Sequence, residues 1–175
     1  MVYAMVLCFD KQSEDKFIDI TKKIAHSGIN KHTFDSKALP HITVAAFETD
    51  SIDEIIPIFD NYCINLNSEN VFWASLGAFI PSVIYAAPVL NEYLLGVCSA
   101  LNKHIEEFAK AEFTGHYRPY QWVPHTTLAS RLNEQELKIA FDVAIQNFAA
   151  FGGNVNRLLL IECSQCIEVK TWHLT

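Results

Sequence analysis

The chain has 175 residues, of which half are hydrophobic and only 19% are charged. This composition excludes a disordered polyelectrolyte, and the length fits a single domain with a sizeable buried core. The formal net charge is −7, whereas proteins that bind a long polyphosphate backbone usually carry a positive net charge. We therefore expect any nucleic-acid partner to be short, or to be touched only at one end.

Cysteine usage and hydropathy predict a reducing, cytoplasmic environment without membrane contact. The count of five cysteines is odd, which argues against a closed disulfide framework. The apolar run at 2–9 lacks a basic leader and meets Asp10 at once, so it is typical of a first strand and not of a signal peptide. No apolar stretch approaches the length of a transmembrane helix.

The first half of the chain alternates between strand and helix patterns, separated by polar segments. In chain order the patterns predict a buried strand at 2–9, a helix over about 12–27 capped by Gly28, an irregular segment at 29–39 and a strand at 40–47. A short helix should follow, with Ser51 and Glu54 as its capping box, and Pro57 should kink or shorten it.

The second half repeats this alternation. It predicts a hairpin of strands 71–80 and 82–87 around Pro81-Ser82, and then a long helix over 90–110 whose inward-facing residues are Leu94, Val97, Leu101, Ile105 and Phe108. An aromatic-rich loop at 115–122 should lead into a strand at 124–129. A helix should then run from an Asn133–Glu136 cap through Phe148 and end at Gly152-Gly153, followed by strands near 155–163 and 166–174. No linker or low-complexity stretch divides the halves, so we expect two α/β lobes that share one core.

A short motif occurs twice, at a separation close to half the chain. PHITVA at 40–45 and PHTTLA at 124–129 share Pro, His, Thr and Ala at four of six positions. Because residues i and i+2 of a strand project from the same face, His41 and Thr43 should point together, and so should His125 and Thr127. Two such strands facing each other would bring two imidazoles and two hydroxyls into one cleft.

These four side chains are a suitable set for cleaving a phosphodiester. An imidazole with a pKa of ~6.5 can act as base or acid at neutral pH, so two of them can share one reaction. Threonine hydroxyls can donate to the non-bridging phosphate oxygens, where charge builds in the transition state. This chemistry requires neither a metal nor a cofactor. One HxT would be a weak signal, but two on strands, each after a proline, are a strong one.

HITV at 41–44 and HTTL at 125–128 both match the H-x-[ST]-hydrophobic signature of the 2H phosphoesterases, the 2′-5′ RNA ligase-like superfamily. The chain resembles this family over nearly its whole length. The resemblance implies an α/β (α+β) fold in which 1–175 form a single bilobal domain. Its two pseudo-symmetric lobes would each be a small, mostly antiparallel sheet with flanking helices, and they would face each other across a central cleft.

The resemblance also implies hydrolysis of a 2′,3′-cyclic phosphate, a related cyclic nucleotide or a 2′-5′ bond, without a metal. By the same resemblance His41 and His125 are the catalytic pair, and Thr43 and Thr127 are the phosphate ligands. Thr126, where many members carry an apolar residue, departs mildly from the pattern on the face away from the cleft.

Two tyrosines are candidate base-stacking residues. Tyr120 lies in the loop before the second motif, and Tyr85 lies on the hairpin, although strand aromatics more often belong to the core. Arg131 should be too far along its strand to reach the phosphate. The CxxC at 163–166 lacks a second pair of ligands for zinc, so we expect an ordinary turn. The other residues of the loop are weaker candidates, namely His116, Tyr117, Arg118 and Trp122.

Two alternative functions remain open at the level of sequence. A 2′-5′ RNA ligase would run the reverse chemistry, but an acidic protein would then have to bind RNA. A nucleotide- or RNA-end-binding module without turnover would not need both histidines, and both are intact. The expected partner in each case is a small nucleotide or RNA end. The near-symmetric motifs leave open which histidine is the base, which ribose oxygen leaves, and the oligomeric state.

Overall fold

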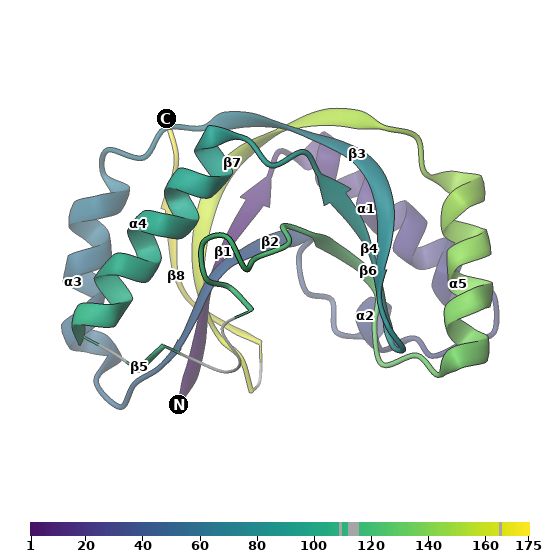
Figure 1. The fold of residues 1–175 in the computed structure, drawn as a ribbon, viewed down its shortest axis with the longest axis horizontal. Helices are drawn as coiled ribbons and strands as arrows, with labels where there is room; N and C mark the ends of the chain where they lie inside the picture. The colour runs from purple at the N-terminus through teal and green to yellow at the C-terminus, as the bar shows by residue number, and fades with distance from the viewer. Residues whose placement is uncertain (109, 112–115, 165) are drawn as a thin grey trace.

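The computed structural model describes residues 1–108, 110–111, 116–164 and 166–175. These residues form an α+β fold in which five helices flank a single sheet of eight strands (Figure 1). The elements in chain order are β1 (Val2–Phe9), α1 (Lys11–Ala25), α2 (His32–Asp35), β2 (His41–Glu48), α3 (Ile52–Cys63), β3 (Glu69–Phe79), β4 (Val83–Pro88), α4 (Glu92–Phe108), β5 (Lys110–Ala111), β6 (Thr126–Ala129), α5 (Glu134–Asn147), β7 (Phe151–Glu162) and β8 (Ile167–His173).

The strand order is β5-β2-β1-β7-β3-β4-β6, with β8 paired to β7, and every pairing is antiparallel. The antiparallel sheet with flanking helices is therefore confirmed, but the expected pair of separate sheets is replaced by one. The cause is β7, which pairs with β3 over 151–155 and with β1 over 155–162. At about 3.3 Å per residue a strand of this length can serve both halves.

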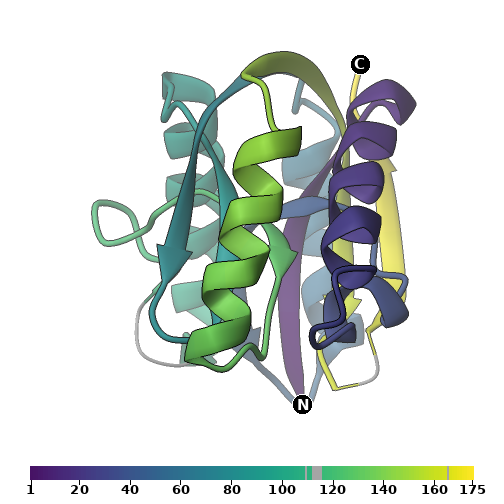
Figure 2. The same cartoon turned by 90° about the vertical axis from the view of Figure 1, so that its right-hand side faces the viewer.

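The sheet bends into an arch, with β1, β2 and β8 in one limb and β3, β4 and β6 in the other (Figure 1). Helices α3 and α4 flank the first limb, and α1 and α5 lie side by side against the second (Figure 2). The two motif strands, β2 and β6, thus belong to opposite limbs. No helix among the described residues is long and apolar enough to cross a bilayer.

An aromatic cluster forms the core where the two limbs meet. The indole of Trp73 on β3 is fully buried, and its ring lies 4.7 Å from that of Phe9, 5.0 Å from Phe17 and 5.1 Å from Phe151. The indole nitrogen donates a hydrogen bond of 3.1 Å to Thr126 Oγ1 on β6. Because Thr126 itself is fully buried, it is a structural partner of the core.

The predicted end of helix α5 is wrong. Gly152 and Gly153 do not end the helix, which stops at Asn147; they lie within β7, which begins at Phe151 and not at 155. A Cβ at Gly153 would lie 1.9 Å from Ser13 Oγ, so the glycine is there because α1 packs on the strand.

The capping box at the start of α3 is also absent, since the Ser51 side chain makes no cap hydrogen bond. Helix α3 continues through Pro57 for twelve residues, so the proline does not shorten it. The capping box of α5 is confirmed: Asn133 Oδ1 accepts from the backbone N–H groups of Gln135 and Glu136, and the Glu136 carboxylate accepts from Asn133 N.

Other boundaries differ by a few residues. Helix α1 ends at Ala25 with His26 as its C-cap, and Gly28 takes a left-handed φ of +86° in the turn beyond it. The segment at 29–39, expected to be irregular, contains the short helix α2. The inward stripe of α4 is buried as predicted from Leu94 to Ile105, while the side chain of Phe108 and residue 109 lie outside what the structure describes.

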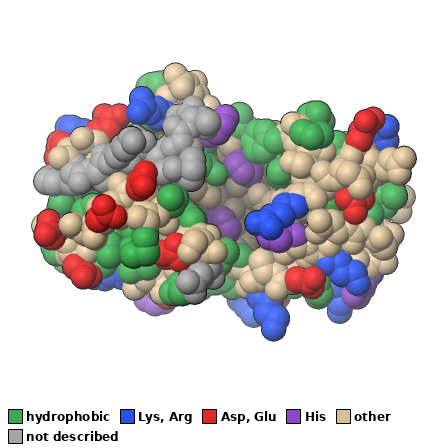
Figure 3. Space-filling view, turned by 90° about the horizontal axis from the view of Figure 1, so that it is seen from below, with side chains coloured by type: hydrophobic (Ala, Val, Ile, Leu, Met, Phe, Trp, Pro, Cys, Tyr) green, Lys and Arg blue, Asp and Glu red, His purple; other side chains and the backbone are tan. Residues whose placement is uncertain are grey.

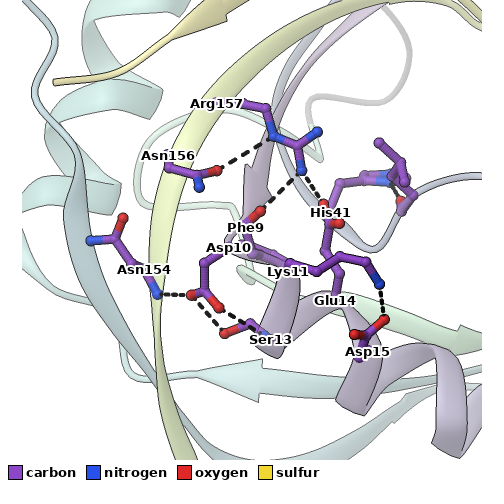
Figure 4. A network of polar contacts seen from close by, with 11 residues as sticks. Phe9, Asp10, Lys11, Ser13, Glu14, Asp15, His41, Asn154, Asn156 and Arg157 are labelled. Atoms are coloured by element: carbon purple, nitrogen blue, oxygen red, sulfur yellow. Dashed lines mark hydrogen bonds and ion pairs between the residues drawn. The ribbon is translucent and has the colours of Figure 1, made fainter.

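The N-terminus of α1 is tied to β7 by a polar network (Figure 4). The Asp10 carboxylate caps the helix by accepting from Ser13 N at 2.9 Å, and it also accepts from Asn154 N at 2.6 Å. Arg157 on β7 forms an ion pair with Glu14 and donates to the Phe9 carbonyl at 3.0 Å. These bonds fix the helix that supplies part of the wall of the site described next.

Candidate functional site

The two motif strands orient their side chains as the alternation predicts. In β2, Ile42 and Val44 are fully buried, while His41 and Thr43 are half-buried on the other face. In and just before β6, Thr126 and Leu128 are fully buried, whereas His125 and Thr127 are half-buried. Each motif therefore presents one imidazole and one threonine on the face that is not packed against the helices.

Both imidazoles are held by the same local hydrogen bond. The Nδ1 atom of His41 lies 2.7 Å from the carbonyl oxygen of Leu39, and Nδ1 of His125 lies 2.8 Å from that of Val123. A carbonyl can only accept, so Nδ1 carries the proton in each neutral ring and Nε2 is the unprotonated nitrogen. The proline between each pair favours an extended residue before it, which helps to present that carbonyl.

One cavity of about 890 Å³ is lined by both histidines and by Thr127. Figure 3 shows histidine side chains gathered in a hollow on the face seen from below the arch. Much of the remaining lining is apolar, and the segment from His32 to His41 forms a continuous part of the wall. The cavity thus collects residues from α1, the α2 segment, β2, the hairpin and the loop before β6.

Burial shifts the acid–base properties of both rings in the same direction. Desolvation is the largest effect and lowers the pKa of His41 and of His125 below the ordinary value, while the backbone carbonyl bonded to each ring opposes the shift. The charge of His41 lowers the pKa of His125 further. The two imidazoles are therefore electrostatically coupled, and a proton on one disfavours a proton on the other.

Thr43 differs from its counterpart Thr127. It is half-buried on the same face as His41, but it is not among the described residues that line the cavity. Its carbonyl oxygen accepts a hydrogen bond of 3.0 Å from the indole nitrogen of Trp122. Trp122 is buried, so this loop aromatic packs against the core and anchors the loop to β2.

The structure brings neither candidate stacking residue to the cavity wall. Tyr120 is 90% exposed and adopts a positive φ of 64°, and it does not line the cavity. Tyr85 is only 9% exposed, and its ring packs against the ring of His125 with centroids 5.3 Å apart. Arg131, which the sequence placed out of reach, is not among the lining residues either.

Phe79, which was not predicted as a site residue from the sequence, lies on the wall of the cavity. Its ring meets that of His125 edge-on, at 4.9 Å and 86°, and lies 4.4 Å from the ring of Tyr85. The alternation of the hairpin could have found this residue, because Phe79 and Val83 pair directly across its two strands. The sequence alone, however, gives no reason to place the hairpin beside the second motif.

The wall formed by α2 was also missed. Its side chains are tied to the end of β6, where Ser130 Oγ lies 2.9 Å from Thr33 Oγ1 and 3.3 Å from His32 Nδ1. Just before the helix, Asn30 Nδ2 donates to the carbonyl of Arg131 at 3.0 Å. A four-residue helix leaves no periodic signal, so only these tertiary bonds reveal that the segment belongs to the site.

The residues that the structure describes contain no group of three or more His, Cys, Asp or Glu side chains arranged to hold a metal ion. The two cysteines of the CxxC are exposed, and they are the first and last residues of the connection between β7 and β8. Cys166 has a positive φ of 54° and lies at the wall of the cavity. Residue 165, between them, lies outside the described part of the chain.

No family model and no curated protein matches this sequence. Among solved structures the chain is similar over 99% of its length to the protein TT0787 of Thermus thermophilus, with a TM-score of 0.66, 13% identity and 98% of that chain covered. It is similar to a protein described as a phosphoesterase, with a TM-score of 0.56, 13% identity and 97% coverage of that chain. It is likewise similar to Kluyveromyces marxianus Usb1, with a TM-score of 0.54, 12% identity and 98% coverage. The whole chain therefore has the fold of these proteins, one of which is described as a phosphoesterase.

Proposed function

We propose that the chain is a phosphodiesterase that hydrolyses a 2′,3′-cyclic phosphate, a related cyclic nucleotide or a 2′-5′ bond by general acid–base catalysis. The observation that carries this proposal is the pair formed by His41 and His125. Both rings are anchored through Nδ1 to a carbonyl two residues earlier, and both line one cavity. Two imidazoles that line one cavity can supply, through Nε2, the base and the acid that this reaction needs.

In the proposed reaction one neutral imidazole takes a proton from the attacking water through Nε2. The water oxygen forms a bond to phosphorus, and the bond from phosphorus to a ribose oxygen breaks. The other imidazole, protonated at Nε2, gives its proton to that departing oxygen. The product is a ribose monophosphate, and proton exchange with solvent restores both rings. None of these proton transfers calls for a metal ion or a cofactor.

Thr127 lines the cavity beside His125, so we assign its hydroxyl to the non-bridging phosphate oxygens. A donor aimed at these oxygens stabilises the charge that builds in the transition state. Thr43 holds the matching position of the first motif, and we propose the same role for it. Unlike Thr127, it is not among the described residues that line the cavity.

The cavity and the net charge support the proposed substrate class. A volume of about 890 Å³ suits a small ligand, and apolar and aromatic wall residues such as Phe34, Phe79 and Val123 suit a nucleobase. The net charge of −7 disfavours a long nucleic acid. A nucleotide or an RNA end, held across the space between the two limbs, is the partner that fits. A fold neighbour described as a phosphoesterase supports the same class of chemistry.

The test is a panel of 2′,3′-cyclic nucleotides, 3′,5′-cyclic nucleotides and 2′-5′ dinucleotides, with the products resolved as 2′- or 3′-monophosphates. We expect turnover of at least one member by the wild-type protein and almost none by His41→Ala prepared in parallel. Binding without product would contradict the proposal and favour a non-catalytic binding module. Joining of RNA ends into a 2′-5′ bond without hydrolysis would instead favour a ligase.

A further inference from the structure

We infer that Tyr85 is a positioning residue for His125, and that it can act in this way because residue 77 is a glycine. The inference rests on the proposed function, in which His125 is one of the two catalytic imidazoles. It assigns to Tyr85 a role that is not base stacking. It also gives an indirect part in catalysis to Gly77, which lies outside both histidine motifs.

The first observation is a row of residues across three strands. Gly77 on β3 pairs directly with Tyr85 on β4, and Tyr85 pairs directly with Thr127 on β6. Directly paired residues of neighbouring strands project from the same face of a sheet. This face carries Thr127, and it also carries Phe79, which is two residues beyond Gly77. Tyr85 is therefore the central side chain of the catalytic face of this limb.

The second observation is a cluster of three rings. The imidazole of His125 lies 5.3 Å from the ring of Tyr85 and 4.9 Å from that of Phe79, and the two aromatic rings lie 4.4 Å apart. These separations are within the range of favourable aromatic contacts. The hydrogen bond from Nδ1 to Val123 fixes one edge of the imidazole, and the two rings restrict its rotation about that bond. Nε2 is thereby aimed at a fixed point.

The third observation is the space that Gly77 leaves. A Cβ at this position would lie 2.5 Å from Cε2 and Cζ of Tyr85 and 2.6 Å from its hydroxyl oxygen, closer than real Cβ contacts occur. The tyrosine ring therefore leans from β4 over the backbone of β3, and not toward Thr127 on β6. This placement keeps Tyr85 buried while Thr127 remains at the cavity wall. A side chain at position 77 therefore requires a shift, and the end of the Tyr85 ring is what it meets.

The test uses steady-state kinetics with 2′,3′-cyclic AMP, or with 2′-5′ ApA if the protein prefers it. We expect Tyr85→Ala to lower kcat by up to about 100-fold, the cost of a reacting group displaced by about 1 Å, with little change in KM. Tyr85→Leu, which keeps apolar bulk in this buried position, should lose kcat in the same way. Tyr85→Phe should retain activity, because it keeps the ring that contacts His125.

Gly77→Ala should lower kcat in the wild-type background and have little further effect in the Tyr85→Ala background, since its action passes through the tyrosine ring. The matched control is Gly152→Ala, also on a strand, where a Cβ would meet its nearest atoms at 3.9 Å. This variant should behave as wild type. Equal losses from Gly77→Ala in both backgrounds would overturn the inference, as would full activity of Tyr85→Ala and Tyr85→Leu.

A readout independent of turnover is the NMR signal of the His125 imidazole, assigned by its loss in His125→Gln. Removing or moving the Tyr85 ring changes the ring current at His125, so Tyr85→Ala and Gly77→Ala should shift this signal and Gly152→Ala should not. If the wild-type protein turns over no substrate, the proposed function fails, whereas the positioning of His125 is still judged by this signal. An unmoved signal in both variants would contradict the positioning itself.

Discussion

The two histidine motifs share four of six residues, yet their surroundings differ. Both imidazoles donate through Nδ1 to a carbonyl two residues earlier. Around His125, however, two aromatic rings pack on the imidazole, while the described residues place no aromatic ring against His41. Likewise Thr127 lines the cavity and Thr43 does not. A short motif thus fixes the bond that orients the ring, but the neighbouring strands decide how firmly each ring is held.

The removal of either imidazole should have the largest effect. We expect His41→Ala and His125→Ala each to lower kcat by about a hundred- to ten-thousand-fold, the usual contribution of general acid–base catalysis. Because the two act as a unit, the double variant should be little slower than the slower single one. Kinetics alongside circular dichroism of each variant checks this. A fully active His125→Ala protein would end the two-histidine mechanism.

Substitution of the two threonines should slow turnover to different extents in the two motifs. Thr127→Ala should slow turnover by about ten- to a thousand-fold, as expected when a donor to the developing charge is removed. Thr43→Ala should also slow it, but by less, because its side chain is not at the cavity wall. The two kcat values, measured side by side, give the comparison directly. A greater loss from Thr43→Ala would show that substrate binding draws β2 closer to the phosphate.

The inward positions Thr126 and Ile42 correspond between the motifs but differ in chemistry. From the sequence alone, Thr126→Val should be nearly silent in catalysis, because the side chain faces away from the cleft. The structure adds a cost in stability of about 1–3 kcal/mol, because the buried indole nitrogen of Trp73 would lose its acceptor. Ile42→Val, which removes one buried methylene, should cost about 0.5–1.5 kcal/mol.

Urea unfolding of both variants measures these free energies, and Thr126→Ser, which keeps the hydroxyl, is the control for Trp73. A Thr126→Val protein as stable as wild type would mean that the indole finds another acceptor. A crippled catalytic rate in Thr126→Val, with Thr127→Ala unaffected, would instead mean that Thr126 and not Thr127 faces the cleft.

The pH profile should distinguish the two histidines. Burial lowers the pKa of both, and the charge of His41 lowers that of His125 further. The histidine that serves as the acid must be protonated, and with a lowered pKa it loses its proton at a lower pH. The bell-shaped profile of kcat/KM against pH should therefore have its maximum on the acid side of neutral. The limbs belong to the coupled pair, and the limb lost in each His→Ala variant names the acid and the base. A flat profile would contradict this assignment.

The same shifts affect stability. A histidine whose pKa is lower in the folded than in the unfolded state contributes stability above its unfolded pKa, and loses it as pH falls through the folded value. Wild-type protein should therefore lose more stability on acidification from pH 7 than His41→Ala does. Thermal unfolding across this pH range measures the difference. An identical pH dependence of the two proteins would show that burial of His41 has no such effect.

A chelator should have the smallest effect, namely none. The proposed proton transfers use only imidazoles, so turnover by wild-type protein should survive strong chelation. Rates before and after dialysis against EDTA check this. Loss of activity that zinc or manganese restores would overturn the metal-independent mechanism, while leaving the fold untouched.

The sequence by itself determined the features that depend on local chemistry. The alternation of β2 and β6, the Asn133 capping box and the buried stripe of α4 all follow from spacing along one element. That two strands each carry a histidine and a threonine on one face also followed from the sequence, because the repeat is visible without a structure. Burial of alternate residues is a local consequence of a strand with one packed face, which explains why these predictions were confirmed.

Tertiary structure decided what depends on distant partners. Gly152-Gly153 has the pattern of a helix stop, but it lies in β7 because α1 packs against Gly153 through Ser13. Only the shared strand β7 turns two expected sheets into one, and only the pairing of β4 with β6 places Tyr85 on His125. These outcomes depend on which strands become neighbours. Strand order is set by the packing of the whole core, which no single segment encodes.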